Sequence, residues 1–398
     1  FAAQLAFAYG FSMLLAWSRG RRYALGFGPV PIIFSINLFL WFRDDWFYLQ
    51  FLMIGIGFLG KELIRWDRDG RRVHIFNPSA FALGLFSLVL IATGSTDLTW
   101  GREIASTLTL APNIYLFLFL VGLVVMYFFS ITLIAGTAAA VLFGLSAAYA
   151  AATGVPYFVD SEIPAAVFLG LHLLVTDPST SPRSSLGKAL FGGLYGIGVF
   201  ALYAILGAAG APTFYDKLLC VPLLNLSVRG IDHAVRGLAA EGPAWRLPGS
   251  RVDGTEAAGG WSSKRWNYAH MAAWGLFFAA MASSGRTDGL HQGDRLPFWE
   301  TACSEGRTGA CDRLLQIEAS YCGDNSAWAC NELGIHYSDG AITAADVDLG
   351  QDFFARACEL RFQAGCLNLL DASRRVRIEP NTMDHRLLLT VRGDKKIA

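Results

Sequence analysis

Charged side chains are scarce in this sequence: Asp, Glu, Lys and Arg make up 16% of its 398 residues, and the formal net charge is zero. Because this balance gives no general attraction to a polyanion, no nucleic-acid partner is expected. The sequence also lacks a P-loop, a Gly-x-Gly-x-x-Gly turn, a nucleophile elbow and a zinc-hydrolase motif. No basic segment precedes the first apolar stretch, so residues 1–18 are not interpreted as a cleaved signal peptide. These absences argue against the common nucleotide-binding and hydrolase classes.

Apolar sequence is abundant instead. Hydrophobic residues make up 54% of the chain, which contains 29 Phe and 11 Trp. A helix needs roughly 17–25 mostly apolar residues to cross a bilayer. Ten runs approach this length, several of them short enough to be tilted, broken or partly re-entrant: about 2–18, 27–42, 46–60, 78–93, 113–132, 134–153, 163–176, 189–210, 214–228 and 267–283. The sequence therefore predicts an all-α, multi-pass membrane protein with about ten transmembrane helices.

Lys and Arg are distributed unequally between alternate loops, and this bias predicts the orientation. One set of loops holds sixteen of them: Arg19, Arg21, Arg22, Lys61, Arg65, Arg68, Arg71, Arg72, Arg183, Lys188, Arg229, Arg236, Arg246, Arg251, Lys264 and Arg265. The opposite loops hold three, namely Arg43, Arg102 and Lys217. The first set is therefore expected to be cytoplasmic. Ten spans then place the tail after Ser283 on the outer side of the membrane.

Six of the seven cysteines lie in this tail as three pairs with a common spacing of eight residues: Cys303/Cys311, Cys322/Cys330 and Cys358/Cys366. On one straight helix, eight residues would separate the two Cα atoms by about 12 Å, whereas a disulfide needs roughly 4.4–6.8 Å. Each pair can therefore bond only if the chain turns between its members, and Gly306, Gly309, Gly323 and Gly365 offer breaks. Zinc is the alternative, although metal ligands are usually two to four residues apart. Disulfides form in oxidising compartments, which agrees with an outer location.

The tail also carries a periodic pattern. The second and third cysteine pairs start 36 residues apart, a period typical of stacked helical hairpins. The stretch from Cys330-Asn331-Glu332-Leu333-Gly334 through Ala357-Cys358 to Gly365-Cys366-Leu367-Asn368 resembles the cysteine-containing SEL-like repeats, relatives of tetratricopeptide repeats. The resemblance covers about 300–375. It implies a small disulfide-stapled α-solenoid that binds protein partners.

Two polar motifs interrupt the apolar runs about a hundred residues apart: His74-Ile75-Phe76-Asn77-Pro78-Ser79-Ala80 and Thr176-Asp177-Pro178-Ser179-Thr180-Ser181-Pro182. In each, an Asn or Asp stands directly before a proline. A capping residue followed by proline predicts the start of a helix. Such starts present free N–H groups and the positive end of a helix dipole, which can hold an anionic group.

The second motif, together with Gly187-Lys188-Ala189-Leu190-Phe191-Gly192-Gly193-Leu194, resembles the membrane subunits of the NqrB/RnfD family. These belong to the sodium-pumping NADH:quinone reductase and to the related Rnf complex. The Phe76-Asn77-Pro78-Ser79-Ala80 stretch matches the family's other signature, and residues 218–232 are similar to its last common span. The resemblance runs from about 20 to 235. It implies two inverted five-helix repeats and electron transfer through flavins.

Family members carry covalent FMN on a Thr in a Ser-Gly-Ala-Thr type motif of an outer loop. The corresponding loop here, about 94–112, has no such motif. Covalent FMN is therefore not expected; Thr107 is the residue that would replace the acceptor. Non-covalent flavin (FMN or riboflavin) or quinone is the expected cofactor. Three histidines that flank or enter the membrane, His74, His172 and His270, raise haem as an alternative, but no two share a helix at ligand spacing.

The candidate cofactor-binding residues come from the two motifs and their surroundings: Asn77, Ser79, Asp177, Thr180, Ser181, Arg183 and Lys188. The polar side chains would line a pocket for a head group, and the two cations would favour a phosphate or a reduced, anionic ring. Asp177 is expected to pair with Arg183 or a helix terminus. The alternative is that Asn77 and Asp177 only cap helices, which is worth roughly 1 kcal/mol each. No metal site is expected.

The sequence thus predicts five regions: an NqrB/RnfD-like transmembrane domain (1–234), a cytoplasmic linker (235–266), an additional transmembrane helix (267–284), periplasmic helical repeats (285–375) and a C-terminal arm (376–398). The chain would lie in a bacterial inner membrane. The first hypothesis is an electron-transfer subunit that uses a non-covalent flavin or quinone and docks other membrane and periplasmic subunits. The second is a non-redox scaffold of a larger membrane assembly. Transport of a small anion between the repeats is a third.

Overall fold

The computed structural model describes residues 1–68, 70–108, 111–159, 161–240, 261–287, 291–371, 373 and 375–377. It is mostly α-helical and divides into two compact units. The first, here the apolar unit, comprises Phe1–Leu145 and Ile163–Asp288; the second, here the disulfide unit, comprises Ser146–Glu162 and Gly289–Ala398. Most of the predicted linker (241–260) and of the predicted C-terminal arm (378–398) lies outside the described residues.

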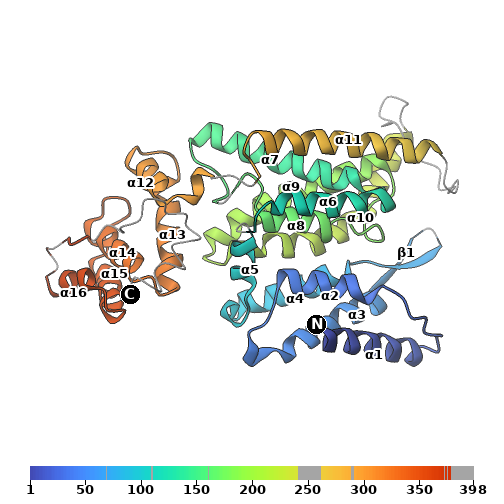
Figure 1. Ribbon diagram of the computed structural model, residues 1–398, viewed down its shortest axis with the longest axis horizontal. Coiled ribbons are helices and arrows are strands. Elements are labelled where there is room, and N and C mark those ends of the chain that lie inside the picture. Colours follow the sequence, from blue (N-terminus) through green and yellow to red (C-terminus); the bar gives the residue numbers. More distant parts are fainter. Residues whose placement is uncertain are drawn as a thin grey trace. The chain divides into compact units, whose positions relative to one another are not determined.

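The helices of the apolar unit follow the apolar runs of the sequence (Figure 1). They are α1 Ala2–Ser18, α2 Pro29–Phe39, α3 Tyr48–Leu63, α4 Pro78–Ala92, α5 Gly101–Leu108, α6 Ile114–Phe129, α7 Thr132–Thr153, α8 Ala165–Leu173, α9 Ser185–Ala208, α10 Asp216–Ala240 and α11 Trp261–Ser283. The last turns of α7, from Ser146 on, belong to the disulfide unit. Each of the ten predicted segments overlaps one of these helices. The additional helix, α5, is short and amphipathic, so a search for long apolar runs does not detect it.

Three helical segments of the described chain are long and apolar enough to cross a membrane: Thr132–Thr153, Ser185–Ala208 and Thr213–Gly237. Helices α2, α4 and α6 are apolar but shorter. Ten full spans are therefore not found. The reason is length: α2 has 11 residues and α8 has nine. At 1.5 Å per residue they would extend about 17 and 14 Å, roughly half of a 30 Å hydrocarbon core.

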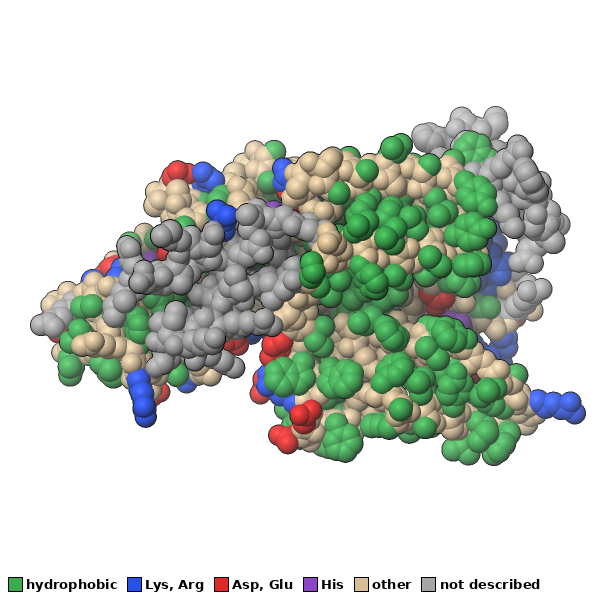
Figure 2. Space-filling model, in the orientation of Figure 1, with side chains coloured by type: hydrophobic (Ala, Val, Ile, Leu, Met, Phe, Trp, Pro, Cys, Tyr) green, Lys and Arg blue, Asp and Glu red, His purple; other side chains and the backbone are tan. Residues whose placement is uncertain are grey.

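Large apolar side chains also cover the outside of the apolar unit (Figure 2). Phe128 on α6 and Leu276 on α11 are 71% and 73% exposed, and Ile205 and Leu223 are 60% exposed. Extended apolar patches are rare on soluble monomers and mark surfaces that contact membranes or other proteins. Together with the three long helices, this surface makes membrane insertion plausible.

A two-stranded hairpin corrects the all-α prediction. Strand β1 (Arg65–Arg68) pairs antiparallel with β2 (Arg71–His74), so that Arg65 lies opposite His74. Gly70 adopts a φ of 73° in the turn, and its N–H donates to Oδ1 of Asp67 at 3.0 Å. In the sequence, the Arg residues of this segment indicate a polar loop. Its backbone nevertheless has a turn that glycine accommodates without a Cβ penalty.

Helices of the apolar unit approach closely where glycine faces a neighbouring backbone. A Cβ on Gly192 of α9 would lie 2.3 Å from the carbonyl oxygen of Ile134 on α7. A Cβ on Gly84 of α4 would lie 2.7 Å from Pro222 of α10. Small residues at helix interfaces allow the dense backbone packing that holds helices together in lipid.

The disulfide unit is a series of short helices: α12 Leu296–Ser304, α13 Ala310–Gly323, α14 Ala327–Asp339, α15 Val347–Glu359 and α16 Gln363–Leu370. They pack around buried side chains that include Trp299, Leu314 and Leu333. Ser326 caps α14 and Asp346 caps α15 by accepting hydrogen bonds from Ala329 N–H and Leu349 N–H. A chain segment ahead of α8 belongs to the same unit: Gly154 O accepts a hydrogen bond from Arg307 at 3.0 Å.

The three predicted disulfides are present: Cys303–Cys311, Cys322–Cys330 and Cys358–Cys366, with Cα–Cα distances of 4.5–4.7 Å. Each joins two consecutive helices across a turn, so zinc is not needed to explain the spacing. The residues that make the turns differ in part from those predicted. Gly306 and Gly309 have positive φ, but the other two turns use Asn325 and Arg361, with φ values of 68° and 64°. Gly323 and Gly365 lie within helices.

The contact at Gly192 gives a prediction about stability. Gly192→Ala should lower the free energy of unfolding by about 1–3 kcal/mol, because the added methyl group meets backbone atoms that cannot rotate away. Gly193→Ala is the matched control: it lies in the same helix, and its nearest neighbour, Val141, would be 3.8 Å away. Thermal unfolding in detergent measures both variants. Equal midpoints for the two variants would contradict the packing.

Candidate functional site

The two polar motifs, about a hundred residues apart in the sequence, meet in the structure. Asn77 caps α4: its Oδ1 accepts hydrogen bonds from Ser79 N and Ala80 N at 3.0 and 3.2 Å, and from Ser79 Oγ at 2.7 Å. Its Nδ2 donates to Leu174 O, just after α8, at 3.0 Å. The predicted helix start at Asn77-Pro78 is therefore confirmed. The Asn77 amide uses both its donor and its acceptor within the protein.

Asn225 of α10 links the first motif to the second. Its Oδ1 accepts a hydrogen bond from Asn77 N at 3.0 Å, and its Nδ2 donates to Thr180 O at 3.2 Å. Asn225, Asn77 and Thr180 are all at least 95% buried. We call this network, in which Asn77 and Asn225 connect α4, α10 and the segment 174–181, the motif junction. It satisfies main-chain groups that water could not reach.

Asp177 does not start a helix. Its Oδ1 accepts a hydrogen bond from Ser179 N at 2.9 Å in a local turn, and the next helix, α9, begins at Ser185 with Ser184 as its cap. Such side-chain-to-backbone turns compete with helix capping in Asp-Pro sequences. Across the junction, Asp177 Oδ2 lies 3.8 Å from His74 Nε2. The predicted helix start at Pro178 is wrong.

Arg68, near the tip of the β1–β2 hairpin, fixes the other side of the junction. Its guanidinium donates twice to Ser181 O, at 3.1 Å each, and once to Asp232 Oδ2 at 2.6 Å. Arg68 is 8% exposed. A buried guanidinium needs a paired carboxylate, and removing one partner from such a pair is strongly destabilising. Arg68 thus ties the hairpin, the second motif and α10 together.

The remaining candidates lie in different places. Ser79, Thr180 and Ser181 are buried in or beside the motif junction. Arg183 is exposed in the turn before α9. Lys188 is on α9, and its Nζ donates to Ser130 O at 2.9 Å, where it caps the C-terminal end of α6. Asn77, Ser79 and Thr180 are thus connected through the motif junction, whereas the Lys188 ammonium group bonds at the end of α6.

Thr107, considered as a flavin acceptor, lies on α5 and donates to Glu103 O at 2.7 Å. His172 is a buried residue of α8, and its ring packs against α6. Its Nδ1 contacts Phe168 O at 2.8 Å, and a Cβ on Gly122 would lie 2.7 Å from its Nε2. Since α6 occupies the space in front of Nε2, His172 has no room to ligate a haem iron. Among the described residues, no group of three His, Cys, Asp or Glu side chains could hold a metal ion.

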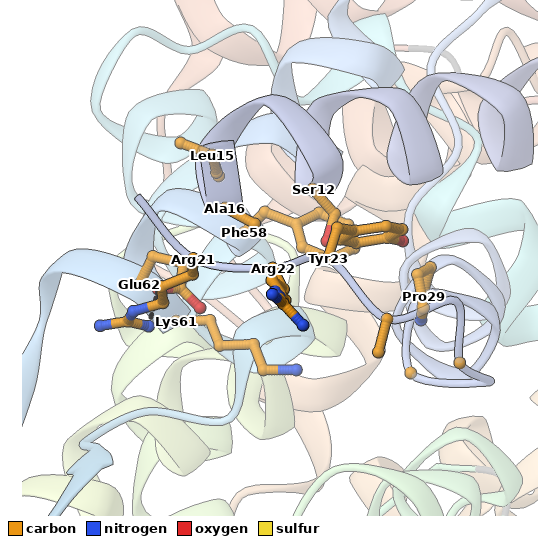
Figure 3. A pocket seen from close by; sticks show the side chains of 13 residues that line it. Ser12, Leu15, Ala16, Arg21, Arg22, Tyr23, Pro29, Phe58, Lys61 and Glu62 are labelled. Carbon is orange, nitrogen blue, oxygen red and sulfur yellow. Dashed lines mark hydrogen bonds and ion pairs between the residues drawn. The ribbon is translucent and has the colours of Figure 1, made fainter. Parts of the chain in front are cut away.

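A pocket of about 240 Å³ lies elsewhere in the apolar unit, between the end of α1, the start of α2 and the end of α3. It is lined by Ser12, Arg21, Arg22, Tyr23, Phe58 and Lys61, among others. Figure 3 shows Arg22 and Lys61 extending into the same space, with Arg21 beside Glu62, to which it is paired at 3.2 Å. Among the described residues, neither the Arg22 guanidinium nor the Lys61 ammonium group has a polar partner.

This pocket suits a small anionic or ring-shaped group. Two unpaired cations supply positive charge, and Tyr23 and Phe58 supply aromatic surface. Pockets for drug-sized ligands usually enclose roughly 300–1,000 Å³. At about 240 Å³, this pocket has room for a head group but not for a whole flavin nucleotide. The pocket is not apparent from the sequence, in which Arg22 and Lys61 indicate only the orientation of the chain in the membrane.

The disulfide unit contains a second set of buried charged residues. Glu332 of α14 is 6% exposed, and its Oε2 lies 3.2 Å from Arg377 Nε. Glu318 of α13 is 1% exposed and lies 3.4 Å from His336. Burial raises the pKa of Glu332 to about 7, although the nearby Arg377 opposes that shift.

No family model, curated protein or solved structure matches the chain.

The pKa of Glu332 predicts a pH dependence. A carboxyl group with a folded-state pKa of about 7 and an ordinary pKa of 4.5 favours folding most below pH 4.5, and this contribution is lost as the pH rises through 7. The difference is at most about 3 kcal/mol. Glu332→Gln should flatten the stability profile between pH 4.5 and 7. Thermal unfolding of wild type and variant at several pH values measures this; parallel profiles would contradict it.

Proposed function

We propose that this chain is an inner-membrane subunit that serves as a scaffold in a larger complex, with an NqrB/RnfD-like apolar unit and a disulfide unit that docks protein partners. In this proposal the long and short helices of the apolar unit form inverted repeats, as the family resemblance implies. The disulfide unit is periplasmic, since three disulfides persist in an oxidising compartment. Its partners are other membrane and periplasmic subunits.

The short helices support the proposed repeat arrangement. Helices α2 and α8 both begin at or directly after a proline, and both are about half as long as a full span. Residues Ala165–His172 of α8 are all buried. Discontinuous helices at corresponding positions are typical of membrane proteins built from inverted repeats. Short or irregular segments are tolerated at membrane depth where protein surrounds them.

The motif junction is the observation that favours a scaffold over a redox subunit. Two of the residues expected to bind a cofactor are engaged within the chain: Asn77 bonds to Ser79 N and Leu174 O, and Asn225 links Asn77 N to Thr180 O. A cofactor head group would need donors and acceptors that are open to it, because polar contacts fix a ligand's orientation. In the motif junction these groups already hold the fold.

Electron transfer through a non-covalent flavin or quinone is the second candidate function. The pocket beside Arg22 and Lys61 supports it, because the two cations would stabilise a reduced, anionic ring. If such a cofactor binds, the protein would orient the ring and tune its potential. The proposed ligand is then a head group rather than a complete FMN molecule.

A cofactor assay on the purified full-length chain separates the two functions. The scaffold proposal predicts no flavin or quinone at one per chain, by visible absorption before and after acid extraction. It also predicts that the native complex, sized from solubilised membranes, dissociates when Cys322 and Cys330 are both replaced by Ala.

A stoichiometric flavin or quinone that is lost in Arg22→Ala/Lys61→Ala would overturn the scaffold proposal and support electron transfer. Arg72→Ala is the matched control, since Arg72 is an exposed cation of the hairpin, away from the pocket. Retention of the cofactor in the control and loss in the double variant would assign the pocket as its site.

A further inference from the structure

Two asparagines of the disulfide unit hold one residue of the chain's own C-terminal region by its main chain. Asn331 Nδ2 of α14 and Asn368 Nδ2 of α16 both donate to Val376 O, at 3.2 and 2.9 Å. In return, Val376 N donates to Asn368 Oδ1 at 2.7 Å. Both main-chain polar groups of Val376 are therefore satisfied by side chains. We call Asn331 and Asn368 the asparagine clamp.

A hydrogen bond between the two clamp side chains fixes their orientation toward Val376. Asn368 Nδ2 also donates to Asn331 Oδ1 at 2.9 Å, which fixes one amide against the other. Asn331 is 0% and Asn368 1% exposed. Buried amides without partners are costly, and here the partners are the N–H and C=O of Val376. Asn331 and Asn368 follow the second cysteine of their respective pairs, so both come from corresponding helices of the two stapled hairpins.

Acidic side chains flank the clamp and pair with the residues on either side of Val376. Arg377 Nε lies 3.2 Å from Glu332 Oε2, and Arg375 forms an ion pair with Asp339. Glu332 and Asp339 both belong to α14, the helix that carries Asn331. The site thus combines main-chain recognition of a central residue with one carboxylate for each neighbouring arginine.

From this arrangement we infer that the asparagine clamp, with Glu332 and Asp339, is a recognition site for an extended peptide of the form Arg-Xaa-Arg, and that residues 375–377 occupy it in cis. Main-chain hydrogen bonds supply affinity, and the side-chain pairs on either side supply specificity. The polar contacts to Val376 involve only its backbone, so the clamp recognises the N–H and C=O of the central residue rather than a polar side chain.

A partner of the proposed docking unit would then carry an Arg-Xaa-Arg segment, and only this identification of a partner rests on the proposed function. A partner subunit with an exposed, extended Arg-Xaa-Arg segment would compete with the chain's own segment. Because the internal segment is tethered, its effective concentration is high, and a free peptide binds weakly while the segment is in place. Release of the segment therefore exposes the site.

The test uses the full-length chain in detergent and a fluorescent heptapeptide of sequence Ser-Arg-Arg-Val-Arg-Ile-Glu, that of residues 373–379. Val376→Pro removes the N–H that donates a hydrogen bond to Asn368 Oδ1, and it should therefore release the internal segment. This variant should bind the peptide about tenfold more tightly than wild type, by fluorescence anisotropy. Val376→Ala is the matched control, and it should behave as wild type because it keeps the N–H.

Two further measurements establish specificity. A peptide with proline at the central position has the same charge but no N–H, and it should not bind to Val376→Pro. Adding Asn368→Ala to Val376→Pro should abolish binding, while circular dichroism and non-reducing mass spectrometry verify helices and disulfides. Arg375→Ala/Arg377→Ala opens the site by a second route and should also increase peptide binding.

The inference is overturned if neither Val376→Pro nor Arg375→Ala/Arg377→Ala binds more peptide than wild type. Equal binding of the proline peptide would also overturn it, because it would show simple charge attraction. Neither outcome depends on the size of the native complex or on bound cofactor. A failure here is therefore distinguishable from a failure of the scaffold proposal.

Discussion

The apolar unit depends on the hydrogen bonds that Asn77 and Asn225 make where α4, α10 and the segment after α8 converge. Inside an apolar bundle, main-chain groups at helix ends cannot turn to water, and each one left unpaired is costly. Asn77 satisfies the start of α4 and the carbonyl of Leu174, and Asn225 satisfies Asn77 N and Thr180 O. Arg68 closes the same region through Ser181 O and Asp232.

This constraint explains why residues expected at a cofactor site bond to other parts of the chain here. Polar groups gathered at a helix start can hold a ligand or can hold another segment of the chain, and the same donors cannot do both at once. In the motif junction they hold the chain. In the disulfide unit the asparagine clamp uses the same chemistry to hold Val376 by hydrogen bonds to its main chain. This segment is near the C-terminal end of the described chain.

Features that depend on local sequence were predictable. Apolar runs marked the helices, the common cysteine spacing marked the three disulfides, and Asn77-Pro78 marked the start of α4. Features that depend on distant partners were not. Asp177 was expected to cap a helix but forms a turn and faces His74, and Asn225 is inconspicuous until its two partners are known. Asn331 and Asn368 lie one and two residues after the second cysteine of their pairs, and this shared neighbourhood is the sequence signal for the clamp.

The free energy of unfolding of Asn225→Leu tests the central claim most directly. This change keeps the size of the side chain but leaves Asn77 N and Thr180 O unpaired inside the bundle. The account predicts a loss of about 2–5 kcal/mol. The loss should be absent from Ser227→Ala, whose hydroxyl bonds only within α10. An Asn225→Leu protein as stable as wild type would contradict the structural role of the motif junction.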